Sequence, residues 1–111
     1  MSEPKAFCFD LDGVIATIVP GNDYTLCQPL EETVRLINEL HQLGHEIIIH
    51  TARGSKTGLD WRDLTESQLR AWQVKYHRLV FGKPAADYYI DDRSVSLSDI
   101  PSLVSALVEE A

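Results

Sequence analysis

The chain has 111 residues, of which 44% are hydrophobic and 24% charged, and its formal net charge at pH 7 is −7. This length allows one domain with a real core and no second one, so we expect a single domain over residues 1–111. The acidic balance argues against nucleic acid as a partner, since binding to a long polyanion normally rests on a basic surface. No apolar run reaches the length of a membrane span and residues 1–5 do not resemble a signal peptide, so we expect a cytoplasmic protein.

A short apolar stretch, Ala6–Phe9, predicts a buried first strand. Asp10 and Asp12 follow it, and side chains at i and i+2 of an extended backbone point to the same side. Carboxylates that close repel each other unless a cation lies between them or one is protonated. A hard divalent ion such as Mg²⁺ prefers oxygen ligands and would relieve the repulsion. The structural alternative is a solvated turn after an edge strand.

The next segments predict a loop, a helix and a strand. Residues 15–29 carry proline and glycine without helical periodicity, which indicates a loop or short hairpin over the strand end. An apolar stripe at spacings of three and four then predicts a helix, which Gly44 should end. The stripe consists of Leu30, Val34, Ile37, Leu40 and Leu43. The β-branched run Glu46–Thr51 predicts a second buried strand.

The second half of the chain predicts two more helices. Asp63 and Glu66 resemble a capping box, which indicates a helix from there to about Tyr76. Ser98 has the character of an N-cap and predicts the start of a last amphipathic helix.

Two further strands are predicted, at residues 77–81 and 88–90. The alternation of strands and helices predicts an α/β fold, a three-layer α/β/α sandwich with a mostly parallel central sheet and helices on both faces. In such sheets ligands bind beyond the carboxyl ends of the strands. The polar residues expected at that edge are Asp10, Asp12, Thr51, Lys83, Asp91 and Asp92.

These residues form four motifs in order, and over residues 6–93 the chain resembles the haloacid dehalogenase (HAD) superfamily of phosphatases. The surroundings of Lys83 resemble small capsule-biosynthesis-type phosphatases. Thr51-Ala52-Arg53 and Asp91-Asp92-Arg93 are also similar to the phosphatase domain of polynucleotide kinase-phosphatases. The segment after Asp12 is too short for the usual cap domain, so the resemblance implies a Rossmann-like HAD core without a cap.

The resemblance implies a Mg²⁺-dependent phosphoric monoester hydrolase that works through an aspartyl-phosphate. Asp10 would be the nucleophile, and Asp12 would protonate the leaving oxygen and later activate water. The implied sets are Asp10, Asp12, Thr51 and Lys83 for catalysis, Asp10, Asp12, Asp91 and Asp92 for the metal, and Thr51, Ala52, Arg53 and Lys83 for substrate. The expected substrates are small phosphate monoesters, in particular sugar phosphates of polysaccharide or capsule biosynthesis.

Several assignments stay open. Arg53 and Arg93 either contact phosphate or form surface ion pairs, and Trp61 either packs or flanks a sugar. With no cap, selectivity should come from residues 15–29 and 53–62, and a neighbouring subunit of a homo-oligomer could close the site from outside. No membrane partner is expected.

Two other functions use similar residues. Response-regulator receivers combine an acidic pair, a phosphoacceptor Asp, a Thr and a Lys on a parallel sheet. In receivers the acidic pair comes first, whereas here the spaced pair Asp10 and Asp12 comes first and Asp91-Asp92 last. A polynucleotide 3′-phosphatase is disfavoured by the net charge of −7.

Overall fold

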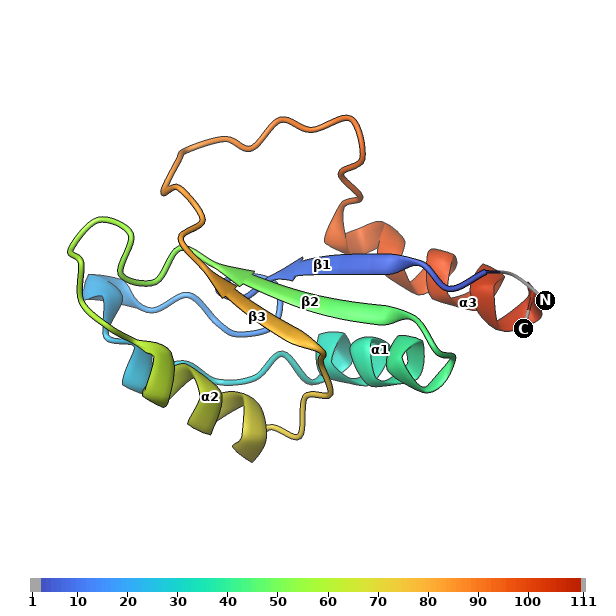
Figure 1. Cartoon of the computed structure of the whole chain (residues 1–111), viewed down its shortest axis with the longest axis horizontal. Coiled ribbons are helices and arrows are strands. Elements are labelled where there is room, and N and C mark those ends of the chain that lie inside the picture. The colour runs from blue at the N-terminus through green and yellow to red at the C-terminus, as the bar shows by residue number, and fades with distance from the viewer. Residues whose placement is uncertain (1–2, 111) are drawn as a thin grey trace.

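A computed structural model describes residues 3–110 of the chain, the side chain of Asn22 excepted. Its sheet has three parallel strands in the order β1 (Ala6–Asp10), β2 (Glu46–Thr51) and β3 (Arg78–Phe81), all visible in Figure 1. The α/β class and the parallel sheet predicted from the sequence are confirmed. Because the strands are parallel, their carboxyl ends all meet at one edge of the sheet.

Three helices accompany the sheet: α1 (Glu31–Gln42), α2 (Arg62–Ala71) and α3 (Ile100–Glu110). α1 connects β1 to β2 and α2 connects β2 to β3, while α3 follows the last strand and packs against α1. Short 3₁₀ turns lie at Pro20–Asn22, Tyr24–Leu26 and Leu97–Asp99. Within residues 3–110 there is no cap domain, as expected, and no helix is long and apolar enough to cross a membrane.

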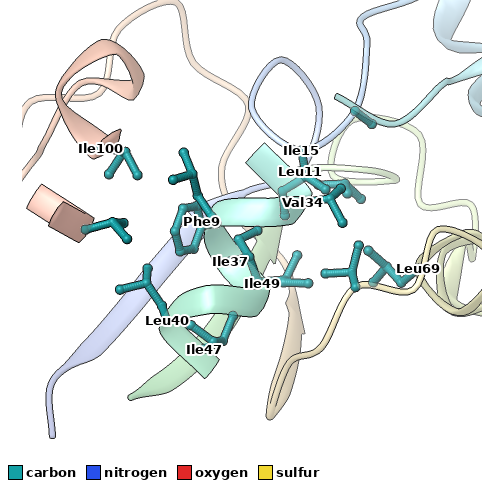
Figure 2. Packing of buried hydrophobic residues seen from close by; sticks show 14 of the residues in the cluster. Phe9, Leu11, Ile15, Val34, Ile37, Leu40, Ile47, Ile49, Leu69 and Ile100 are labelled. Atoms are coloured by element: carbon teal, nitrogen blue, oxygen red, sulfur yellow. The ribbon is translucent and has the colours of Figure 1, made fainter. Parts of the chain in front are cut away.

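The core lies on one face of the sheet (Figure 2). Phe9 of β1 and Ile47 and Ile49 of β2 point to this face and are at most 5% exposed. They pack with the apolar stripe of α1 and with one face of α3. The residues that α1 and α3 contribute are Val34, Leu36, Ile37, Leu40, Ile100, Val104 and Leu107.

The opposite face of the sheet carries no buried side chain among the described residues. Cys8 and Val80 are exposed there, while Ile48 and His50 are half-buried. The sequence predicted helices on both faces. In the structure the core lies on one face. Residues 82–96, which follow β3, contain no helix that could cover the other face, and α3 packs against α1.

The fourth strand predicted at residues 88–90 is not formed. Residues 82–96 contain no helix or strand, and Tyr88 and Ile90 are 84% and 96% exposed. Only residues 82–87 separate β3 from the predicted strand, whereas a parallel neighbour needs a crossover of roughly a dozen residues or more. Local β-propensity was therefore outweighed by topology, and the loop instead arches away from the sheet in Figure 1.

The helix predicted to run to about Tyr76 ends earlier, at Ala71. The cause is Gln73, the only described residue other than glycine with a positive φ, at 59°. A left-handed residue just beyond a helix lets the following N–H groups bond back to the last turn. Here Val74 N donates to the Leu69 carbonyl at 3.0 Å.

Candidate active site

A cavity of about 620 Å³ opens at the carboxyl edge of the sheet. Its floor carries Asp10 and Asp12 from the end of β1, and its walls come from the loops after β1, β2 and β3. This is the edge where parallel sheets bind ligands, and the volume lies within the roughly 300–1,000 Å³ of small-molecule sites. The lining comprises Asp10, Asp12, Ile18, Val19, Gly21, Tyr24, Ala52, Arg53, Gly54, Lys56, Thr57, Leu59, Trp61, Lys83, Ala85, Ala86, Asp87 and Tyr89.

Asp10 and Lys83 form an ion pair on the cavity floor, with Nζ 3.1 Å from Oδ2. The other oxygen of Asp10 accepts the Leu11 N–H at 2.9 Å. Lys83 is placed by its own backbone, because its N–H donates to the Thr51 carbonyl at 3.2 Å and its carbonyl accepts the Ser55 hydroxyl at 2.7 Å. Its ammonium also lies 3.9 Å from the ring centre of Tyr89. A carboxylate and a cation are thus held side by side at the pocket.

Asp12 forms a second ion pair, with Arg53. Its Oδ2 accepts from Arg53 Nε at 3.0 Å, and its Oδ1 accepts from Arg53 Nη2 at 2.9 Å. Such two-pronged pairs fix the plane of the carboxylate as well as its position. The Asp12 side chain is 24% exposed and the Arg53 side chain 0%, so the arginine is shielded from solvent while part of the carboxylate stays exposed.

Thr51 is not part of the cavity lining. Its side chain is fully buried, and its hydroxyl accepts the Arg53 N–H at 3.0 Å. It was expected to contact the phosphoryl group directly. In the structure it shapes the turn that presents Ala52 and Arg53, because a hydroxyl at a strand end readily caps a nearby backbone N–H.

The acidic pair Asp91-Asp92 does not join Asp10 and Asp12. Both residues are exposed in the irregular loop after β3, outside the cavity lining. Asp91 accepts the Arg93 N–H at 2.8 Å, and this hydrogen bond lowers the pKa of its carboxyl. Among the described residues, no group of three or more His, Cys, Asp or Glu is suited to hold a metal. The missing fourth strand explains the separation, since it would have delivered the pair to the carboxyl edge.

A buried thiol also touches Asp12, and the sequence did not predict it. Cys27 Sγ lies 3.6 Å from Asp12 Oδ1 and the residue is 4% exposed. Burial, followed by the negative charge of Asp12, raises the pKa of this thiol. Burial and Asp12 likewise raise the pKa of Tyr24. Both residues come from the loop over the strand end, where no periodic pattern reveals which side chains turn inward.

Apolar and aromatic side chains also line the cavity. Trp61 and Tyr24 meet edge to face with their ring centres 5.0 Å apart, and Leu59 and Ile18 are 60% and 76% exposed beside them. Aromatic and aliphatic surfaces of this kind can contact the carbon face of a ligand while charged groups bind its polar part.

A crystal structure of an MCSG target from Vibrio cholerae superposes on this chain with a TM-score of 0.80. The two are 30% identical over 96% of this chain and 98% of the other. This chain belongs to the family of that Vibrio cholerae protein. This match establishes the family and the fold of the chain and says nothing of the reaction.

Two further solved structures share the fold of this chain. The Pnkp1/Rnl/Hen1 complex matches with a TM-score of 0.60, 24% identity and 82% of this chain covered. The Pnkp1/Rnl/Hen1 RNA repair complex matches with a TM-score of 0.59, 20% identity and 96% covered. In each case this chain spans 32% of the matched chain. No family model and no curated protein matches the chain.

Proposed function

We propose that this protein is a phosphatase that hydrolyses small phosphate monoesters in the cavity at the carboxyl edge of the sheet. The observation that carries the proposal is the pairing of Asp10 with Lys83 and of Asp12 with Arg53 on one cavity floor. Phosphoryl transfer needs an in-line nucleophile, a proton donor and fixed positive charge, and these residues would supply all three. The fold shared with the Pnkp1 complexes and the HAD-like motif order support the same reaction.

The reaction would run in two displacements. Asp10 attacks phosphorus, and the bond from phosphorus to the leaving oxygen breaks as an aspartyl-phosphate forms. Asp12 gives its proton to the leaving oxygen, so that an alcohol departs. Water then attacks the same phosphorus and passes its proton to Asp12. The bond from phosphorus to Asp10 breaks, so inorganic phosphate leaves and the Asp10 carboxylate is restored.

Lys83 would stabilise the phosphoryl oxygens. Its ammonium already lies 3.1 Å from Asp10, so a phosphoryl group attacked by Asp10 would come within its reach. A fixed cation at developing negative charge is among the largest contributions an active site makes. Lys56 lines the same cavity and adds positive charge farther out.

We propose that Mg²⁺ is the cofactor. The oxygens of Asp10 and Asp12 fit a hard cation in type, and both carboxylates reach the same cavity. Further oxygen ligands would come from Asp91 and Asp92. Tyr89 already lines the cavity, and Asp91 follows two residues later, within roughly 7 Å of extended chain. When bound, Mg²⁺ would offset the charge between the anionic substrate and the carboxylates.

The leaving group would be a small polar molecule with an apolar face, such as a sugar. The apolar and aromatic side chains of Trp61, Tyr24 and Leu59 line the cavity together with the charged groups and would contact the carbon side of a sugar ring. Sugar phosphates of polysaccharide or capsule biosynthesis are therefore our first choice of substrate. A sugar ring is small enough for the cavity of about 620 Å³.

A polynucleotide 3′-phosphatase is the second candidate, because one fold match belongs to an RNA repair complex. The net charge of −7 disfavours it, since the protein would repel a polynucleotide. A receiver-like phosphoacceptor would hold phosphate without turnover, and the test below separates these three functions.

The test is phosphate release from a panel of sugar phosphates, nucleotides and 3′-phosphorylated oligonucleotides, with Mg²⁺ or with excess chelator. We expect release from small esters that chelation abolishes. Mg²⁺ should also raise the melting temperature of the unmutated protein, and this rise should shrink in Asp92→Asn. Activity undiminished by chelator would contradict the metal assignment, and no release from any ester would contradict the phosphatase assignment.

A further inference from the structure

Arg53 is the most completely bonded charged side chain at the site. Its guanidinium makes two hydrogen bonds to Asp12, one to Thr65 Oγ1 at 3.1 Å and one to Gln68 Oε1 at 2.7 Å. An arginine has about five N–H donors, so little capacity remains. Because the side chain is also 0% exposed, Arg53 is poorly placed for the phosphate contact expected from the sequence.

The contacts of Arg53 determine how Asp12 can act. An ionised carboxylate accepts at about four lone-pair sites. Arg53 uses one on each oxygen, and the thiol of Cys27 approaches Oδ1. The capacity that remains belongs to the exposed 24% of the Asp12 side chain, which faces the cavity. These contacts hold the Asp12 carboxylate in one orientation.

Arg53 is itself held from several sides. Thr65 and Gln68 both come from α2, three residues apart and so on one helix face. The ring of Tyr24 lies against the guanidinium, with Cζ 4.5 Å from the ring centre. Gln68 Nε2 also donates to the Tyr24 carbonyl at 2.6 Å, so the same glutamine ties the loop over the strand end to α2.

We propose that Arg53 is a positioning residue, which fixes the orientation of the Asp12 carboxylate and is itself fixed by Thr65, Gln68 and Tyr24. This inference rests on the proposed phosphatase function and goes beyond it, since it removes Arg53 from the phosphate ligands. The loop that carries Tyr24 then helps to hold Asp12 in place, because Tyr24 contacts Arg53 and also lines the cavity. Only a planar fork can satisfy both oxygens of Asp12, so lysine is not equivalent to arginine here.

The test uses two variants that keep most of the buried network. Removing one partner of a buried ion pair outright is strongly destabilising, so Arg53→Ala is a poor choice. Arg53→Lys keeps the positive charge but cannot form the two parallel hydrogen bonds to Asp12. Gln68→Ala removes one hydrogen bond that holds Arg53 and leaves the Asp12 side chain unchanged. Arg35→Gln is the control, because Arg35 is an exposed residue of α1 that pairs with the exposed Glu32 and Glu39 and is not among the cavity-lining residues.

We expect Arg53→Lys to lower kcat by roughly 10²-fold, the lower end of what general acid–base catalysis contributes. Gln68→Ala should lower kcat by about tenfold, as outer-shell partners typically do. Inhibition by inorganic phosphate should stay unchanged in both variants, and Arg35→Gln should behave like the unmutated protein. An Arg53→Lys variant with full kcat, or one whose phosphate inhibition weakens as much as its kcat falls, would overturn the proposal.

A second measurement is independent of turnover. The carboxyl ¹³C resonance of Asp12, assigned with Asp12→Asn, reports the surroundings of that side chain directly. We expect it to shift in Arg53→Lys and in Gln68→Ala and to stay in place in Arg35→Gln. An unmoved resonance would overturn the positioning role even in an active enzyme. If the unmutated protein hydrolyses no ester, the phosphatase function is wrong, whereas a shifted resonance would still support Arg53 as the group that holds Asp12.

Discussion

At the scale of single residues, the two aspartates at the carboxyl end of β1, Asp10 and Asp12, differ in their partners. Asp10 pairs with Lys83, whose side chain is 15% exposed, whereas Asp12 pairs with the fully buried Arg53. In the first pair the carboxylate is itself 36% exposed, and both side chains line the cavity. In the second pair the buried arginine holds both oxygens of Asp12 by hydrogen bonds. This difference matches a nucleophile that must meet phosphorus and an acid–base group that must keep its orientation.

Replacing Asp10 by asparagine should abolish turnover, because an amide is not a usable nucleophile. We expect a loss of at least about three orders of magnitude in kcat, as when other enzymes lose their nucleophile. The fold should persist, since the Asp10 side chain is 36% exposed. Circular dichroism and phosphate release would measure both effects. Asp63→Asn, an exposed residue in the first turn of α2, is the control, and Asp10→Asn with near-normal turnover would exclude Asp10 as nucleophile.

Cys27 should make stability depend on alkaline pH. Burial raises the pKa of its thiol above the ordinary 9.0, so the folded protein keeps a proton that the unfolded chain releases. The folded state then binds more protons, and stability falls as the pH rises above 9.0. Urea unfolding from neutral pH to above 9.0 should show a shallower fall in Cys27→Ala than in the unmutated protein. Parallel curves would show that this thiol contributes nothing.

At the scale of elements, the end of α2 carries a local strain. Gln73 has φ 59°, a region that costs side chains other than glycine about 1–2 kcal/mol. Its backbone carbonyl accepts from the Asn38 side chain at 2.9 Å, a contact that a substitution would leave in place.

Gln73→Gly should therefore stabilise the protein by about 1 kcal/mol, since glycine adopts positive φ without the steric cost. Gln28→Gly is the matched control, because Gln28 is exposed and has no positive φ. It should be neutral or slightly destabilising. Chemical denaturation would compare the two variants, and a destabilised Gln73→Gly would show that the left-handed residue is not strained.

The elements with strong periodic patterns were predicted well. The bounds Glu46–Thr51 of β2 agree with the prediction, and α1 begins after Pro29 and ends before Gly44. The prediction of a strand at residues 88–90 was wrong. A local pattern of β-forming residues carries no information about how many residues are needed to cross the sheet. Arg53 lies 41 residues from Asp12 in sequence, so their ion pair follows from the β1–β2 neighbourhood and could not be derived from spacing.

At the scale of the whole molecule, the sheet places three loops around one cavity, and residues 3–110 form no cap above it. Loops of this kind commonly carry the binding and catalytic residues, and the parallel strands hold those residues in place. The acidic chain and the two cation–carboxylate pairs on the cavity floor together favour a small anionic substrate over a polymer. The central claim is that Asp10 carries the phosphoryl group during turnover.

The most direct measurement of that claim is rapid acid quenching of the protein during turnover of a phosphate ester with Mg²⁺, followed by peptide mass spectrometry. We predict a phosphoryl group on Asp10 that appears with substrate, decays as phosphate is released, and is absent from Asp10→Asn. Phosphate release without any phosphorylated peptide, or a stable phosphoryl group on another aspartate, would contradict it.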